Sequence, residues 1–293
     1  ICWSLVGSEM CIRDSDYGIN SKSGQVNSAE VRKILDFAQS SNIDFLDTAP
    51  AYGDSEKKLG NYDLSHFHLT SKTRHFQGTG IDDTELNLFR QDFNQTLKHL
   101  KQEKIYGLLV HNSKDLLKSG SDKLFRELQE LKTNGKLLKI GVSVYDPIEL
   151  DAVLNRFDLD IVQLPFNILD RRMLDSGILD FLYKKNIEIH SRSAFLQGLL
   201  LAKSDLFLKQ FDQWQGLWKL WKEWLEDNKI SALEATIRYV LGTKEISRVI
   251  VGVDSERQLK EIIAASSGEL PDIPSALRTD DTNLLNPTNW KDS

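Results

Sequence analysis

The feature that most constrains the fold of this chain is a regular alternation of amphipathic helices with short apolar segments of strand character. It runs from about residue 27 to residue 266, and its predicted strands are 43–49, 67–73, 105–113, 137–144, 160–166, 187–195 and 246–253. Such alternation indicates a parallel sheet with helices outside it. Eight units in about 250 residues have the size of a closed (β/α)8 TIM barrel. A doubly wound open sheet is the alternative, but no GxGxxG motif follows an early strand.

The helices between these strands are predicted from apolar positions that recur at helical spacing. They are expected at 27–41, 85–100, 124–136, 148–157, 173–186, 206–242 and 255–266. Within 206–242, four tryptophans at helical spacing favour an outer-layer helix packed on the barrel over a membrane-surface helix. We expect one barrel domain over residues 16–270 and an irregular tail over 271–293, which is rich in proline, aspartate and asparagine.

Residues 1–15 have no helical or strand period that continues into the rest of the chain. Glu9, Arg13 and Asp14 interrupt what would be the apolar region of a secretory signal. The segment resembles translated adapter sequence, so we expect it to be non-native and the native chain to start near Asp16. The first barrel strand would then be missing or replaced by foreign sequence. The alternative is an ordinary variable N-terminal strand.

Composition excludes several classes of partner. The net charge of −6 and the pI near 5.6 argue against nucleic-acid binding, which needs a clustered basic surface. No apolar run is long enough for a membrane helix. Only two cysteines occur, Cys2 and Cys11, so no disulfide framework holds the fold, and we expect a cytoplasmic protein. The oligomeric state is not readable from the sequence.

Four polar residues follow the ends of three successive predicted strands, and these ends face the active site in a barrel. They are Asp47, Tyr52, Lys72 and His111. No activated serine or cysteine accompanies them, and only His111 is placed as a metal ligand, so we expect neither nucleophilic catalysis nor a metal. An ammonium beside a phenol lowers the pKa of the phenol. We therefore interpret Asp47, Lys72 and Tyr52 as a tuned general acid, with His111 as a hydrogen-bond donor to a developing oxyanion.

These residues lie in segments that resemble the aldo/keto reductase family. The stretch DTAPAYGDSEKKLG (47–60) is similar to the family signature DTAxxYGxSExxLG, and TSKT (70–73) and LLVHNS (108–113) are similar to its lysine and histidine segments. The resemblance covers about residues 16–266. It implies that Asp47, Tyr52, Lys72 and His111 form a catalytic tetrad and that NADPH lies extended across the barrel mouth. A small carbonyl compound would be the substrate.

The segments implied to bind the cofactor match less evenly. GVS (141–143) resembles the family's GVSN, which implies that Ser143 and Gln163 hold the nicotinamide carboxamide, with Asn167 nearby. The usual asparagine after the serine is Val144 here, and the family's tyrosine that stacks on nicotinamide corresponds to Arg192. Residues 192–200 would follow the pyrophosphate, with Gln197, Gly198 and Leu199 in contact. Tyr17 and Phe166 are further candidates for lining the pocket.

The segment IVGVDSERQLKEI (250–262) resembles the family's adenosine-phosphate segment and implies contacts from Gly252, Asp254, Ser255 and Gln258. Asp254 stands where many members carry an arginine for the 2′-phosphate, and a carboxylate there favours a ribose hydroxyl instead. Arg257 could compensate. We expect NADPH, with NADH as the alternative.

Two hypotheses remain for the activity. The first is an enzyme that reduces an aldehyde or ketone reversibly. The second is a non-catalytic nicotinamide-binding redox sensor or regulatory subunit. The complete set of four residues favours the enzyme, because a sensor needs no acid tuned for proton transfer. A cofactor-free barrel isomerase is disfavoured by the segments 192–200 and 250–262. The sequence does not name the substrate; Arg192 near the nicotinamide position suggests a sugar or nucleotide-sugar carbonyl.

Overall fold

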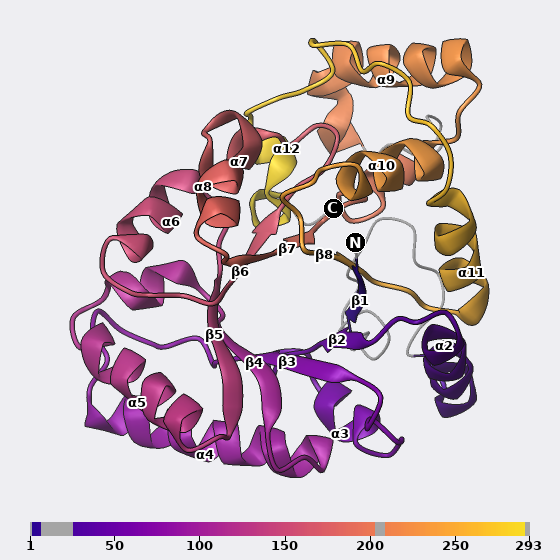
Figure 1. Ribbon diagram of the computed structural model, residues 1–293. Coiled ribbons are helices and arrows are strands. Elements are labelled where there is room, and N and C mark those ends of the chain that lie inside the picture. Colours follow the sequence, from indigo (N-terminus) through magenta and orange to yellow (C-terminus); the bar gives the residue numbers. More distant parts are fainter. Residues whose placement is uncertain (1, 7–25, 203–208, 291–293) are drawn as a thin grey trace.

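The computed structural model describes residues 2–6, 26–202 and 209–290. Within them, eight parallel strands close into a barrel in the order in which they follow along the chain (Figure 1). The predicted (β/α)8 barrel is therefore confirmed. The strands are β1 (Cys2–Val6), β2 (Phe45–Asp47), β3 (His68–Lys72), β4 (Ile105–Val110), β5 (Leu137–Ser143), β6 (Ile161–Pro165), β7 (Glu188–Arg192) and β8 (Arg248–Val251).

The first strand position is occupied by residues of the suspected N-terminal segment. In β1, Leu5 pairs with Leu46 of β2 on one side and with Val251 of β8 on the other, which closes the barrel. The first strand is thus present. That residues 1–15 are foreign to the native protein stays a prediction, and Tyr17 lies outside the described residues.

The helices surround the barrel, and most of them match the predicted ranges. They are α2 (Ser28–Ser40), α3 (Ser55–Leu59), α4 (Asp83–Leu100), α5 (Ser121–Thr133), α6 (Pro147–Leu154), α7 (Arg172–Asp175), α8 (Ile178–Lys184), α9 (Gln215–Asn228), α10 (Ala232–Leu241), α11 (Glu256–Ala265) and α12 (Thr282–Leu285). Short 3-10 helices are η1 (Ser113–Leu117), η2 (Leu199–Leu201), η4 (Lys209–Trp214) and η5 (Pro287–Asn289).

Two helical predictions need correction. The single helix expected over 173–186 is divided into α7 and α8, because Gly177 adopts a left-handed φ of 78° between them. The short helix α3, within the loop after β2, was not predicted. It ends at Gly60, where a Cβ would lie 1.9 Å from the carbonyl oxygen of His99. Glycine is therefore needed for α3 to pack against the end of α4.

The other helices form where their sequences provide caps and an apolar stripe. In α2, the side chain of Asn27 accepts a hydrogen bond from the backbone N–H of Glu30 at 3.0 Å, which satisfies a free donor of the first turn. The buried face of α2 consists of Val31, Ile34, Leu35 and Ala38. It belongs to the main hydrophobic core between the strands and the surrounding helices.

A second hydrophobic cluster lies at one end of the barrel, around α9. Trp218, Trp221 and Trp224 are buried there together with residues of η2 and α12. Figure 1 shows α9 beside the chain that leads to α12 and away from the strands. The aromatic stripe thus packs inward, as expected, but against loops and the C-terminal segment instead of the barrel wall. No helix among the described residues has both the length and the apolar character needed to cross a membrane.

Candidate active site at the carboxyl ends of the strands

Asp47 and Lys72 form a buried ion pair at the ends of β2 and β3. Lys72 Nζ lies 2.5 Å from Asp47 Oδ2, and both side chains are at most 2 % exposed. The other carboxylate oxygen, Oδ1, accepts hydrogen bonds from Thr70 Oγ1 and Gln163 Nε2, each at 2.9 Å. Every oxygen of the carboxylate therefore has a partner, which fixes the position of the ammonium.

Tyr52 lies beside this pair, in the loop between β2 and α3. The Nζ of Lys72 is 4.9 Å from the centroid of its ring. The loop is held by a hydrogen bond of 3.1 Å between the hydroxyls of Thr48 and Ser55. Helix α3 is anchored in turn by the buried Glu56, which accepts hydrogen bonds from Ser71 Oγ at 2.6 Å and Thr96 Oγ1 at 3.0 Å. The 47–60 stretch, which resembles the family signature, thus forms one compact turn that positions the phenol.

The electrostatics of Tyr52 and Lys72 differ in part from expectation. Burial raises the pKa of Tyr52 above its usual value. The Lys72 charge acts to lower this pKa, but its effect is smaller than that of burial. The expected net decrease is therefore wrong in sign. Burial alone would lower the pKa of Lys72, but Asp47 and Tyr52 raise it above its usual value. At neutral pH the site thus holds a protonated phenol next to a charged ammonium.

His111 follows β4 and completes the group of four. Its ring meets the ring of Tyr52 edge-on, with the centroids 5.9 Å apart. Burial, together with the charges of Lys72 and Arg192, lowers the pKa of His111 to about 3. The imidazole is therefore neutral at physiological pH. The structure brings together all four residues that the sequence singled out.

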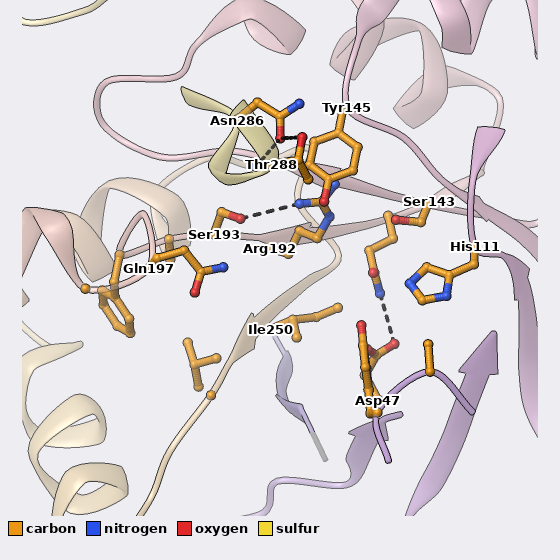
Figure 2. Close-up of a pocket in the computed structure, with 18 of the residues that line it drawn as sticks. Asp47, His111, Ser143, Tyr145, Arg192, Ser193, Gln197, Ile250, Asn286 and Thr288 are labelled. Atoms are coloured by element: carbon orange, nitrogen blue, oxygen red, sulfur yellow. Dashed lines mark hydrogen bonds between the residues drawn. The ribbon is translucent and has the colours of Figure 1, made fainter. Parts of the chain in front are cut away.

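Asp47, Tyr52 and His111 line a cavity of about 1040 Å³ at the carboxyl ends of the strands (Figure 2). Of the residues predicted to contact a cofactor, most line this cavity, namely Ser143, Gln163, Arg192, Gln197, Gly198, Gly252, Asp254 and Gln258. Ser143, at the end of β5, pairs in register with Gln163 in the middle of β6. The cavity extends from the ends of the strands to the start of α11, where Arg257 and Gln258 line it.

Four predicted contacts are not found on the cavity wall. Leu199 is fully buried in the second hydrophobic cluster, because the turn at Gly198 directs the chain inward. Ser255 caps α11 and accepts a hydrogen bond from the backbone N–H of Gln258 at 3.2 Å. Phe166 is buried against Tyr239, at 5.3 Å between ring centroids. Asn167 is buried too, and it donates to the carbonyl of Ser193 at 3.1 Å.

The loop after β7 has an unusual backbone. Ser193, Leu196 and Gln197 have φ angles of 62°, 47° and 54°, and Gly198 has a φ of 82°. A left-handed conformation at a residue with a side chain costs about 1–3 kcal/mol and is commonest at functional sites. Since Ser193, Gln197 and Gly198 all line the cavity, the strained loop is part of its wall.

Several wall residues were missed by the sequence analysis. His75 stacks on His111, with ring centroids 4.4 Å apart. Tyr145 follows β5 and faces Arg192 (Figure 2). Asn286, Thr288 and Asn289 of the C-terminal tail also line the cavity. The position of Tyr145 after a strand was a usable signal, but nothing in the sequence links the tail to the barrel mouth. The described residues include no cluster of three or more histidine, cysteine, aspartate or glutamate side chains suited to a metal.

Comparison with known proteins agrees with this geometry. The profile of the Aldo/keto reductase family matches residues 17–274. Because the match spans most of the 293 residues, the chain belongs to the aldo/keto reductase family. The family consists of oxidoreductases that use nicotinamide cofactors and act on small carbonyl compounds.

Individual relatives are distant. The chain is 27 % identical to L-galactose dehydrogenase of Arabidopsis thaliana over 245 residues, which are 76 % of this chain and 73 % of the relative. It is 25 % identical to the NADH-specific methylglyoxal reductase of Escherichia coli over 51 % of this chain and 50 % of that protein. Among solved structures, the aldo-keto reductase AKR11C1 from Bacillus halodurans has a TM-score of 0.70 at 17 % identity, covering 92 % of this chain and 88 % of its own. At 17 % identity, the similarity to AKR11C1 shows the fold alone.

Proposed function

We propose that this protein reduces the carbonyl group of a small aldehyde or ketone to an alcohol, reversibly, with Tyr52 as the proton donor. The observation that carries the proposal is the buried Asp47–Lys72 pair, at 2.5 Å, beside the Tyr52 ring. A nicotinamide cofactor supplies hydride to the carbonyl carbon when bound. Tyr52 gives its proton to the carbonyl oxygen, and the Lys72 ammonium stabilises the phenolate that remains.

His111 polarises the carbonyl in this proposal. Its pKa of about 3 keeps the imidazole neutral, so it acts as a hydrogen-bond donor and does not compete with Tyr52 as an acid. Asp47 holds the Lys72 ammonium in place and makes no contact with the substrate.

The donor set of the cavity fits a nicotinamide dinucleotide. Ser143 and Gln163 offer a hydroxyl and a carboxamide near the tyrosine, which suit the polar carboxamide of a nicotinamide ring. The strained loop of residues 193–198 and the start of α11 continue the wall from there. These elements would hold the diphosphate and the adenosine in that order.

The charges at the adenosine end bear on the form of the cofactor. Asp254 and Glu261 both line the cavity, and Arg257 is paired with Glu261 at 2.6 Å. A 2′-phosphate would meet two carboxylates there, whereas a ribose hydroxyl can donate a hydrogen bond to one of them. The sequence favoured NADPH. With Arg257 engaged, we propose NADH as the preferred form, and the NADH-specific relative is consistent with this choice.

The remaining wall of the cavity points to a hydroxylated substrate. It includes the amide and hydroxyl side chains of Asn112, Asn286, Thr288 and Asn289. Such groups can pair with the hydroxyls of a sugar or polyol, and a relative at 27 % identity is an L-galactose dehydrogenase. We propose a polyhydroxylated aldehyde or ketone, and the cytoplasm as the compartment.

The test compares the wild type with Tyr52→Phe, which removes only the phenolic oxygen. We expect turnover to fall by a factor of ~10³ or more, since the general acid is lost, while NADH binding followed by tryptophan fluorescence stays within about twofold. Wild-type binding of NADPH in the same titration is expected to be weaker. Unchanged turnover in the variant would remove Tyr52 from the mechanism. Cofactor binding without turnover of any aldose, ketose or short aldehyde in the wild type would favour the redox-sensor hypothesis.

A further inference from the structure

Arg192 is a cation of the cavity with an unusual setting. It ends β7, and its guanidinium carbon lies 4.0 Å from the centroid of the Tyr145 ring. Its Nη2 donates to the carbonyl oxygen of Val144 at 3.0 Å. Figure 2 shows the side chain between Tyr145, Ser143 and the loop at Ser193. The loop after β5 thus fixes the guanidinium inside the cavity, close to the strand ends.

The charge of Arg192 is not balanced by a carboxylate of the described residues. The other cations on or near the cavity have such partners, as Lys72 has Asp47, Arg172 has Asp170 at 2.7 Å and Lys114 has Glu149 at 3.3 Å. The three partners of Arg192 are the carbonyl oxygen of Val144, the hydroxyl of Ser193 at 3.5 Å and the aromatic ring of Tyr145, all of them neutral. A half-buried cation with neutral partners exerts its field on whatever occupies the cavity.

The neighbouring titratable groups respond to this field. The Arg192 charge contributes to lowering the pKa of His111, after burial and the charges of Lys72 and His75. It also acts to lower the pKa of Tyr52, against the dominant effect of burial. The influence of Arg192 therefore reaches the groups at which the chemistry is proposed to occur.

We propose that Arg192 makes the site discriminate between the two oxidation states of its cofactor and bind the reduced form more tightly. The inference rests on the proposed function, which places the nicotinamide ring among Ser143, Gln163 and Arg192. The oxidised ring carries a positive charge and the reduced ring is neutral. A fixed cation beside the ring disfavours only the oxidised form. Arg192 thereby promotes release of the oxidised cofactor after each reduction.

The size of the effect follows from the screening of the site. For two like charges several ångströms apart in a partly buried site, a penalty of roughly tenfold in the dissociation constant is the expected scale. The quantity that isolates it is the ratio of the dissociation constants of NAD+ and NADH, because any change in packing affects both forms alike.

The experiment measures this ratio by fluorescence titration of the full chain and three variants. Arg192→Met removes the charge and keeps a long side chain, and we expect it to lower the ratio roughly tenfold by tightening NAD+. Arg192→Lys keeps the charge and should keep the ratio. Lys114→Met is the matched control, since Lys114 is also a cation of the cavity but is paired with Glu149. Its ratio should equal that of the wild type.

The outcomes separate the inference from the function on which it rests. If the wild type binds both forms and Arg192→Met leaves the ratio unchanged, or weakens both forms equally, the inference is wrong and the proposed function stands. If the wild type binds neither NADH nor NADPH, the proposed function itself fails. A ratio that falls equally in Arg192→Met and Arg192→Lys would assign the effect to guanidinium stacking and would also overturn the electrostatic inference.

Discussion

Asp47 and Lys72 lie in the protein interior as a pair of opposite charges, and each is needed there to offset the desolvation of the other. The Asp47 carboxylate has two further hydrogen-bond donors, Thr70 and Gln163, and Lys72 also donates to the carbonyl of Thr48, at 3.2 Å. Removal of the ammonium therefore leaves a buried carboxylate without a counter-charge. Under the proposed function, the pair is therefore both a structural and a chemical requirement of the site.

At the scale of residues we predict that the two requirements can be separated. Lys72→Met should lower the free energy of unfolding by about 3–5 kcal/mol and abolish turnover, because Asp47 is left charged and unpaired. The double variant Asp47→Asn with Lys72→Met removes both charges. It should recover most of the stability and none of the turnover. Urea denaturation and a carbonyl-reduction assay measure the two quantities, and equal stability of the single and double variants would contradict the argument.

Among the elements, α9 supports the cavity without touching the four central residues. The Nε1 of Trp221 donates to the carbonyl of Leu200 at 3.3 Å, and Trp224 Nε1 donates to the carbonyl of Asp272 at 2.9 Å. These bonds hold η2 and the start of the C-terminal tail, both of which continue into the cavity wall. The tryptophans of α9 thus support two segments of the cavity wall.

For this element we predict that Trp221→Ala lowers the free energy of unfolding by about 3–5 kcal/mol, since Trp221 is 4 % exposed and stacks on Trp224. Cofactor should also bind more weakly, because Leu200 follows Gln197 and Gly198 in one loop. Lys222→Ala, on the exposed side of the same helix, should change stability by less than about 0.5 kcal/mol. Thermal and urea unfolding test both, and a loss below that of the lysine control would show that α9 does not support the fold.

The accuracy of prediction from sequence also differs between elements. The strands and the four residues at their ends could be predicted, because β-strand and helix periods alternate clearly and parallel strands bring their carboxyl ends together. Leu199 and Ser255 were assigned by analogy, and local turns decide that one is buried and the other caps a helix. The role of residues 286–289 could not be predicted, because it depends on the tertiary contact of α12 with α9.

For the whole molecule, the neutral histidine of the site implies a dependence of stability on pH. The pKa of His111 is about 3 in the folded protein against an ordinary 6.5, and that of the buried His190 is lowered as well. Between these values the unfolded chain binds a proton that the folded chain does not. The free energy of unfolding therefore falls as the pH falls from about 6.5 towards 3.

We predict that His111→Asn reduces this slope. In the wild type His111 contributes up to about 1.4 kcal/mol per pH unit within the window, and the variant should lose that contribution. Urea denaturation at several pH values between about 7 and 4 measures both slopes. Above the window the two slopes should coincide, which serves as the internal control. Parallel slopes throughout would mean that His111 titrates alike in the folded and unfolded chain.

The tail that reaches the cavity has a consequence for how such a protein changes over evolutionary time. In the proposed function, residues 47–111 supply the reacting groups, whereas Asn286, Thr288 and Asn289, much later in the chain, supply part of the cavity surface that a substrate would meet. Mutation or recombination in the part of the gene that encodes residues 286–289 can therefore alter which compound is accepted while the chemistry stays intact. Selection for a new substrate and selection for a working reaction act on separate stretches of DNA.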